Sequence, residues 1–330
     1  AGRTGGLPFV GVGWYRTEFD VPQFQAGKRA TILFDGAMSH ANVYINGQKV
    51  GYWPYGYNSF HFDITKYLKP GEKNTLAVRL ENLPESSRWY PGAGLYRNVH
   101  LIITEDAYIP VWGTYITTPS VNEKFAKVNV RTKVVLPEGA DPAKYSMETS
   151  VWNPNKQKLT AVRTSLAQMK YNNNQAEQEF VIQAPSLWSP EMPALYSAET
   201  RLYEGDKLKD IYTTPFGIRS IEIIPDKGFF LNGKRTVFKG VCNHHDLGPL
   251  GAAVNDAAIR RQIRILKDMG CNAIRTSHNM PAPELIRACD EMGMMIMAES
   301  FDEWNVAKCK NGYNPVSYTH LRAHETLANL

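Results

Sequence analysis

Three features are scarce in this sequence, and each scarcity excludes a class of protein. No apolar run approaches the roughly 20 residues that a membrane-spanning helix needs, so we expect no membrane span. The 37 lysines and arginines are spread along the chain, which argues against nucleic-acid binding despite a net charge of +5. Only four cysteines occur, without a Cys-x-x-Cys pair, so neither a zinc ribbon nor a disulfide framework is indicated.

The beginning of the chain lacks an initiator methionine and the basic and then apolar pattern of a signal segment. We therefore expect the natural start to lie upstream, and for the parent protein we favour a periplasmic or secreted location over the cytoplasm. What is present is a chain of 330 residues with 43% hydrophobic content. This is enough for two or three domains with cores of their own.

Residues 1–105 alternate apolar and polar side chains in short runs, the pattern of antiparallel strands. The dipeptide Asn46-Gly47 predicts a hairpin, because both central residues of a type I′ turn need a positive φ. Many short strands separated by glycine and proline predict a jelly roll. Residues 106–219 continue the strand pattern and have the length of a second, immunoglobulin-like β-sandwich.

The pattern changes in residues 220–315, where apolar strands alternate with helices. Strands are predicted at residues 235–246, 271–277 and 294–300, and helices at residues 255–270 and 282–293. The first helix is expected to begin at Asn255 or Asp256, to bury Ile259, Ile263 and Leu266, and to stop at Gly270. Buried strands in this order indicate a parallel sheet, and three successive units predict the first part of a (β/α)8 barrel.

Polar side chains follow each predicted barrel strand, at the rim where such barrels carry their functional groups. His244, His245 and Asp246 end the first strand, and three interpretations stay open for them: a polar loop, a wall of a substrate pocket, or a metal site. The metal site is disfavoured, because neighbouring strand residues point to opposite faces. Cys242, further back in the strand, is expected to point into strand packing.

Arg275 lies inside an otherwise apolar strand, where an unpaired charge would be costly to bury. Glu299 is its expected partner, in an ion pair that is either structural or fixes the geometry of a pocket. His278 is either a capping residue or a pocket residue. Trp304 is either a loop anchor or an aromatic surface for a sugar ring.

Several stretches keep the order and spacing of a known family, among them "GWYRTEFDVP", "SSRWYPGAGLYRNVHL", "KGVCNHHDLG", "NAIRTSHNMPAPELIRACDEMG" and "ESFDEW". On these stretches, from about Gly13 to Asn314, the chain resembles glycoside hydrolase family 2, and within it the β-galactosidase-like members. The resemblance implies a jelly-roll sugar-binding domain, an immunoglobulin-like domain, and a TIM barrel that hydrolyses β-galactosides or β-glucuronides with retention of configuration.

The resemblance also implies roles for single residues. His244 and His278 match histidines that touch the sugar in the innermost subsite, and Arg275 matches a pocket arginine held by Glu299. Arg88 falls where the family sends a loop of the first domain into the barrel mouth. The expected substrate-binding residues are Arg88, His244, Asp246, Arg275, His278, Asp302 and Trp304, with Glu299 as structural support.

No cofactor and no metal are expected, because Asn305 stands where some members of the family have a magnesium-binding histidine. The expected partner is a β-linked galactoside or a related glycan, and an oligomer of the full-length parent stays open. In this family both catalytic carboxylates are glutamates on later barrel strands, the first in an Asn-Glu pair. The one such pair here, Asn122-Glu123, lies in the second sandwich, so we expect an inactive fragment of an exo-acting enzyme.

Residues 316–330 break the strand and helix pattern of the preceding units. We expect them to be a non-native tail, with a divergent natural loop as the alternative. Two further functions stay open for the whole chain. One is β-glucuronidase activity of the same family, and the other is a non-catalytic carbohydrate-binding module.

Overall fold

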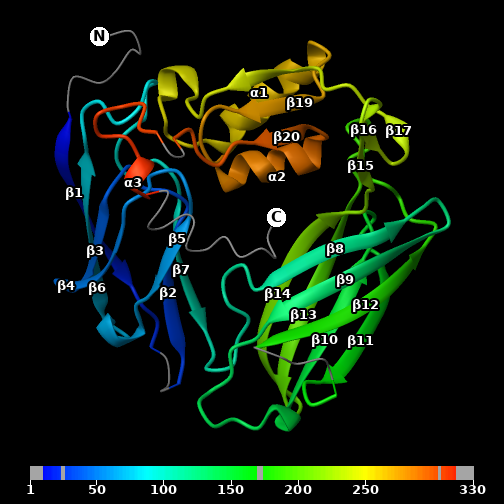
Figure 1. The fold of residues 1–330 in the computed structure, drawn as a ribbon. Coiled ribbons are helices and arrows are strands. Elements are labelled where there is room, and N and C mark those ends of the chain that lie inside the picture. Colours follow the sequence, from blue (N-terminus) through cyan, green and yellow to red (C-terminus); the bar gives the residue numbers. More distant parts are fainter. Residues whose placement is uncertain (1–9, 24–26, 169–173, 304–305, 317–330) are drawn as a thin grey trace.

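The computed structural model describes residues 10–23, 27–168, 174–303 and 306–316. Two β-sandwiches, coloured blue to cyan and green in Figure 1, stand beside each other, and the yellow to orange helices and strands lie across their upper ends. This arrangement confirms the predicted fold class, a multidomain β and α/β protein. The predicted pocket residue Trp304 and the predicted tail beyond Val316 lie outside the described residues.

The first sandwich packs one four-stranded sheet against one three-stranded sheet. The first sheet has the order β1 (Gly11–Asp20), β6 (Lys73–Asn82), β3 (Ala41–Ile45), β4 (Gln48–Trp53). The second has the order β5 (Phe60–Asp63), β2 (Arg29–Phe34), β7 (Val99–Thr104), and the 3-10 turn η1 (Thr65–Tyr67) follows β5. Alternate side chains, such as Val43 and Val78, are buried between the sheets. Asn46 and Gly47 have φ values of 50° and 79°, which confirms the predicted hairpin.

The second sandwich has the four-plus-three strand arrangement of an immunoglobulin-like domain. One sheet has the order β11 (Lys158–Ser165), β10 (Tyr145–Trp152), β13 (Leu195–Glu204), β14 (Lys207–Gly217). The other has the order β12 (Gln175–Gln183), β9 (Phe125–Lys133), β8 (Thr114–Val121), and the 3-10 turn η2 (Pro142–Lys144) precedes β10. Its core is built from alternate residues of both sheets, including Val128, Val151 and Phe180.

A small antiparallel sheet joins the second sandwich to the barrel strands. It consists of β15 (Ile221–Ile224), β16 (Gly228–Leu231) and β17 (Lys234–Arg235). The prediction of a single strand over residues 235–246 was therefore wrong: its first residue pairs in this small sheet, and only Gly240–Asn243 forms a barrel strand. The turn Asn232-Gly233, with φ values of 52° and 75°, was the available signal for a hairpin here.

The barrel segment contains the predicted parallel sheet, but helices cover only one of its faces. Its strands are β18 (Gly240–Asn243), β19 (Ala273–Thr276) and β20 (Met295–Ala298), and the covering helices are α1 (Asp256–Asp268) and α2 (Pro283–Met292). The segment also contains the 3-10 turn η3 (Gly248–Leu250) and the short α3 (Asn314–Val316), whose Val316 packs against the first sandwich. The side chain of Asn255 caps α1 by accepting from the backbone N–H of Ala258. Gly293 ends α2 in the left-handed conformation. No helix in the described part of the chain has the length and apolar character of a membrane span.

The two faces of the parallel sheet differ. Ile274 and its neighbours Val241 and Ile296 pack against the helices. Because side chains alternate along a strand, Cys242, Arg275 and Met297 lie in one row on the opposite face. The prediction that Cys242 points into strand packing was wrong, since its side chain is exposed, as is that of Met297 at 57%.

Candidate functional site

The carboxyl ends of the three parallel strands bring the predicted polar residues to one edge of the sheet. His244 follows β18, His278 follows β19 and Glu299 follows β20. The rings of His244 and His278 lie 5.4 Å apart, and Nδ1 of His278 lies 3.3 Å from Oε2 of Glu299. This shared edge is called the rim cluster, and it comprises Trp89, His244, Arg275, His278, Glu299 and Asp302.

Arg275 and Glu299 form an ion pair inside the rim cluster. Nη2 of Arg275 lies 3.0 and 2.8 Å from the two carboxylate oxygens of Glu299. Nη1 of Arg275 donates to Oγ of Ser277 at 3.2 Å and lies 3.5 Å from Sγ of Cys242. The charge of Arg275 is therefore compensated by Glu299, and the ion pair holds Glu299 in place beside His278.

Arg88 reaches the rim cluster from the first sandwich. Its Nη2 donates to both carboxylate oxygens of Asp302, at 3.1 and 2.9 Å, and Nζ of Lys308 lies 3.0 Å from the same carboxylate. Burial raises the pKa of Asp302, but hydrogen bonds from Lys308 and Arg88 outweigh burial and lower it. The loop that carries Arg88 is thereby joined to the end of the third barrel strand.

Trp89 is a rim residue that sequence reasoning missed. Its ring lies 5.2 Å from the ring of His278 and 6.0 Å from that of His244, so it covers both histidines. Its Nε1 donates to the hydroxyl of the fully buried Tyr57 at 3.1 Å, which sets the orientation of the ring. The signal was its position next to Arg88 in the loop, together with the size of an aromatic ring.

The two adjacent histidines have different roles. His244 is exposed at the rim, whereas the ring of His245 packs into the first sandwich, 5.1 Å from the ring of Tyr57, with its Nε2 at 3.1 Å from the carbonyl oxygen of Pro91. Burial, followed by the charge of Arg97, lowers the pKa of His245 to about 4. Burial and the neighbouring His278 also lower the pKa of His244.

Asp246 is half-buried just after the two histidines. Its negative charge raises the pKa of His244 and of His245 and so opposes part of the lowering caused by burial. The carboxylate of Asp246 therefore lies close to both imidazoles. Within the part of the chain that the structure describes, its carboxylate forms no hydrogen bond or ion pair with the rim cluster. Its expected contact with substrate stays a prediction.

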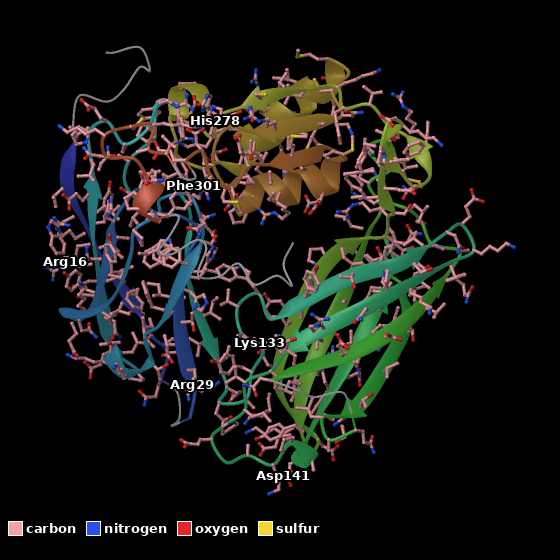
Figure 2. All side chains as sticks on the ribbon, in the orientation of Figure 1. Arg16, Arg29, Lys133, Asp141, His278 and Phe301 are labelled. Atoms are coloured by element: carbon pink, nitrogen blue, oxygen red, sulfur yellow. The ribbon has the colours of Figure 1, made fainter. Side chains whose placement is uncertain are left out.

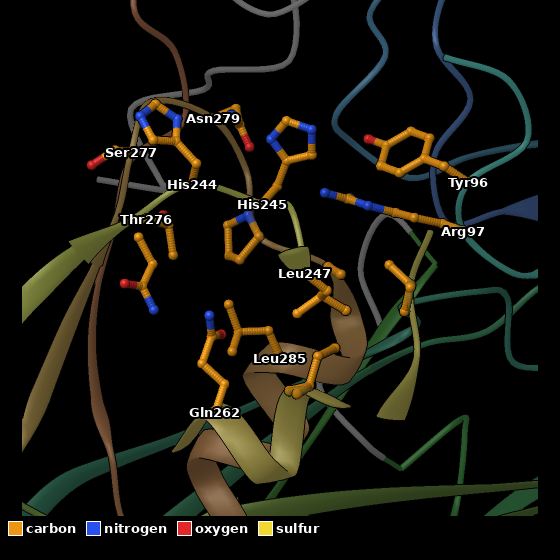
Figure 3. Close-up of a pocket in the computed structure, with 15 residues that line it drawn as sticks. Tyr96, Arg97, His244, His245, Leu247, Gln262, Thr276, Ser277, Asn279 and Leu285 are labelled. Carbon is orange, nitrogen blue, oxygen red and sulfur yellow. The ribbon is translucent and has the colours of Figure 1, made fainter. Parts of the chain in front are cut away.

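A cavity of about 30 Å³ lies behind the histidines, between the first sandwich and the barrel helices (Figure 3). The labelled residues around it include Arg97, His245, Gln262 and Asn279. Nδ1 of His245, Nδ2 of Asn279 and Nε of Arg97 are buried there without a hydrogen-bond partner among the described residues. A polar space of this size suits about one water molecule and is too small for a sugar ring.

His278, Glu299 and Asp302 present three ligand-type atoms within 4.8 Å of one another. The same two carboxylates already bind Arg275, Arg88 and Lys308, so a cation would have to replace existing ion pairs. The carboxylate of Glu303, after the third strand, accepts from the backbone N–H of Lys308 at 2.9 Å and of Asn314 at 3.2 Å. These residues do not fit a metal, and we propose none here.

Glu299 and Asp302 also fall near the separation of about 5 Å at which retaining glycosidases hold their two carboxylates. Such a pair needs one carboxyl that keeps its proton near neutral pH. The pKa of Asp302 is instead lowered, and Glu299 is held by Arg275. The geometry therefore suits binding and orientation of a polar ligand better than acid catalysis.

Three family models match the chain in succession. They are described as Glycosyl hydrolases family 2, sugar binding domain, over residues 8–105; Glycosyl hydrolases family 2, over residues 108–219; and Glycosyl hydrolases family 2, TIM barrel domain, over residues 222–326. The models follow the order of the two sandwiches and the parallel sheet.

Named relatives agree with the family models. Beta-galactosidase BoGH2A of Bacteroides ovatus is 44% identical over 95% of this chain, which spans 37% of that protein. A putative beta-glucuronidase of Formosa agariphila is 39% identical over 92% of the chain, which spans 28% of it. A solved glycosyl hydrolase family 2 structure from Bacteroides cellulosilyticus superposes with a TM-score of 0.88 at 35% identity, covering 96% of this chain and 40% of that one.

Proposed function

Because the chain belongs to glycoside hydrolase family 2, we propose that it forms the N-terminal part of a retaining, exo-acting β-galactosidase and holds the terminal sugar at its rim cluster. The chain spans well under half of the length of the relatives it matches, so the activity of a longer protein is part of this proposal. The proposal is supported above all by one observation. A loop of the first sandwich meets the ends of three successive barrel strands there.

Each side of the rim cluster offers a different kind of contact. The ring of Trp89 offers an aromatic surface to the C–H face of a sugar. The imidazoles of His244 and His278 offer hydrogen-bonding nitrogens, and Arg275 with Glu299 keeps His278 in position. These contacts come from four separate segments, so the pocket exists only when the first sandwich is docked on the barrel segment.

A galactoside is favoured over a glucuronide by the charges of the rim. The three described cations, Arg88, Arg275 and Lys308, each already face a protein carboxylate. A glucuronide would bring a further negative charge next to Glu299 and Asp302 without an additional cation among the described residues to receive it. The name of the relative with 44% identity supports the same choice, and the β-glucuronidase relatives keep the glucuronide as the second candidate.

The test of activity uses the purified chain with 4-nitrophenyl β-galactoside and 4-nitrophenyl β-glucuronide. We expect no turnover of either, because the described carboxylates at the rim are held in ion pairs and the pKa of Asp302 is lowered. Turnover that disappears in Glu299→Gln or Asp302→Asn would contradict this and would make that pair the catalytic one.

The test of binding follows methyl β-galactoside by ligand-observed NMR on the same chain. We expect saturation transfer from the protein to the sugar. Trp89→Ala should lower the affinity about tenfold, because it removes the aromatic ring on which the sugar packs. Trp112→Ala is the matched control, since Trp112 is 57% exposed and belongs to the segment between the sandwiches. Equal binding by Trp89→Ala and the unchanged chain would contradict the proposed subsite, and preferred binding of methyl β-glucuronide would favour the second candidate.

A further inference from the structure

The outward face of the sheet β1, β6, β3 and β4 carries an ordered row of side chains that the rim does not use. The strand register places Trp14 opposite Arg79, Arg79 opposite Asn42, and Asn42 opposite Tyr52. The row therefore crosses all four strands with an aromatic ring at each end. Three strand spacings separate those ends, which is about 14 Å.

The rows on either side support the two rings. Tyr44 packs beside Trp14 with ring centroids 5.6 Å apart. At the other end, the hydroxyl of Tyr52 lies 2.7 Å from Nδ1 of His40. In the middle, Nη1 of Arg79 lies 3.1 Å from Oε2 of Glu81. The aromatic and polar groups are thus held in place by contacts with each other across the sheet.

The face is open in the structure. The exposed fractions of Trp14 and Tyr52 are 59% and 42%, both large for aromatic residues. This sheet lies on the side of the first sandwich away from the second sandwich, as Figure 1 shows. Arg16 shares the face with Trp14 by strand alternation, and its label stands at the outer margin in Figure 2.

We propose that this outward face is a second carbohydrate-binding site, separate from the rim, that takes an uncharged oligosaccharide of several sugar units lying across the strands. Aromatic rings at both ends pack on the C–H faces of two sugars, and Asn42, the Tyr52 hydroxyl and the Arg79–Glu81 pair bind hydroxyl groups between them. The distance between the rings exceeds one pyranose, so the site selects for chain length.

The charges of the row favour this occupant. Arg79 is neutralised by Glu81, and both ends of the row are uncharged, so an uncharged polar ligand is complementary to it. A second copy of the chain is less suitable, because charged side chains are depleted in the centre of protein interfaces and this row has Arg79 in its middle. The matching family model for residues 8–105 is described as a sugar binding domain, in agreement with the site.

The experiment measures binding of oligosaccharides to the 330-residue chain by isothermal titration calorimetry. The probes are β-1,4-galactotetraose, cellotetraose and xylotetraose, with galactose as the control for length. All titrations are run in the unchanged chain, in Trp14→Ala, Tyr52→Ala and Asn42→Ala, and in the rim variant Trp89→Ala. Circular dichroism checks the fold of each variant. If Trp14→Ala or Tyr52→Ala does not fold, Asn42→Ala tests the same face in its place.

We expect at least one tetrasaccharide to bind, with an affinity about tenfold lower in Trp14→Ala and Tyr52→Ala and unchanged in Trp89→Ala. Galactose should not bind measurably in Trp89→Ala. The proposal is overturned if no tetrasaccharide binds, or if Trp89→Ala removes binding while Trp14→Ala keeps it. It is also overturned if sedimentation shows a dimer that Trp14→Ala dissociates and no probe competes with it. The two binding proposals can fail independently, because Trp89→Ala tests the rim cluster and Trp14→Ala tests the outward face.

Discussion

The barrel segment touches the two sandwiches at opposite ends of its sheet, and the two contacts are built differently. At the rim, Arg97 of the first sandwich donates to the carbonyl oxygen of Met280 at 2.9 Å, and Tyr55 donates to that of Ser300 at 3.1 Å. At the other end, Nε1 of Trp188 in the second sandwich donates to the carbonyl oxygen of Asp290 at 2.8 Å, and Nζ of Lys267 donates to that of Pro190 at 2.9 Å.

The difference lies in the polar atoms that stay unpaired. Four buried polar atoms at the first contact, in Arg97, His245, Asn279 and Glu284, have no hydrogen-bond partner among the described residues. The second contact is centred on Trp188, which is 5% exposed. Among the described residues around Trp188, no buried polar side-chain atom lacks a partner. Unpaired buried groups cost stability and collect where a structure serves binding. The first contact therefore keeps unpaired polar atoms behind the rim cluster, whereas the second is a structural joint.

The strongest test of the comparison is Arg97→Ala. Arg97 is 5% exposed and donates to the carbonyl oxygens of Asp35, Tyr57 and Met280. Its removal takes a donor from all three, and among the described residues only the carbonyl of Asp35 keeps a second one, the hydroxyl of Ser59 at 3.3 Å. We expect a loss of roughly 5 kcal/mol in the free energy of unfolding, together with release of the first sandwich from the barrel segment. Urea unfolding and limited proteolysis measure the two effects. Arg79→Ala, on the outward face of the same sandwich, should cost less than about 1 kcal/mol.

The second test is Trp188→Ala at the structural joint. Removing this buried ring should cost roughly 4 kcal/mol, because it leaves a cavity beside Gly217 and an unpaired carbonyl at Asp290. Binding of methyl β-galactoside at the rim should persist at temperatures where the variant is folded. Trp112→Ala, at a 57% exposed position, is the control and should stay within about 0.5 kcal/mol. Loss of rim binding in folded Trp188→Ala would remove the distinction between the two contacts.

The third test is the pH dependence that His245 gives to the first contact. Its pKa is lowered to about 4 in the folded chain against 6.5 for an ordinary histidine, so the unfolded chain binds more protons between these values. The stabilisation that neutral His245 gives to the folded chain is fully present above pH 6.5. As the pH falls toward 4, the free energy of unfolding decreases by roughly 3 kcal/mol. Calorimetric unfolding from pH 7 to 4 measures it. His245→Gln should show a flatter profile, and identical slopes would refute the assignment.

The smallest expected effect is that of Arg88→Ala. Arg88 is half exposed, and Asp302 keeps Lys308 at 3.0 Å when Arg88 is removed. We expect a change of about 0.5 kcal/mol in the free energy of unfolding, within the range of exposed ion pairs. Differential scanning calorimetry gives the measurement, with Lys308→Ala as the matched variant. A loss of several kcal/mol would mean that this pair, and not Arg97, holds the first contact together.

Local sequence patterns predicted the elements that need only neighbouring residues. Asn46-Gly47 forms its hairpin, Asn255 caps its helix, and Gly293 ends the next helix. The apolar face of α1 is buried as expected at Ile259, Ile263 and Leu266. Each of these follows from the φ preferences of one or two residues or from the period of a helix. The changes of pattern along the chain predicted the order of the three domains, and the resemblance to the family agreed with it.

The strand pattern alone did not separate His244 from His245, and only the resemblance singled out His244 as a pocket residue. Nothing in the sequence reasoning indicated Trp89. His245 contacts Pro91 across 154 residues, and Arg88 meets Asp302 across 214. The face on which Cys242 lies also depended on strand register, because a shift of one residue exchanges the two faces.

By itself, the sequence determined the fold type of each domain, the order of strands and helices, and the presence of polar residues at the strand ends. Only the tertiary structure decided which of those residues meet. Periodicity and turn preferences act over a few residues, whereas a pocket is made of contacts between segments far apart in the chain. The rim cluster and the outward row of Trp14 and Tyr52 both exist because packing and strand register bring such segments together.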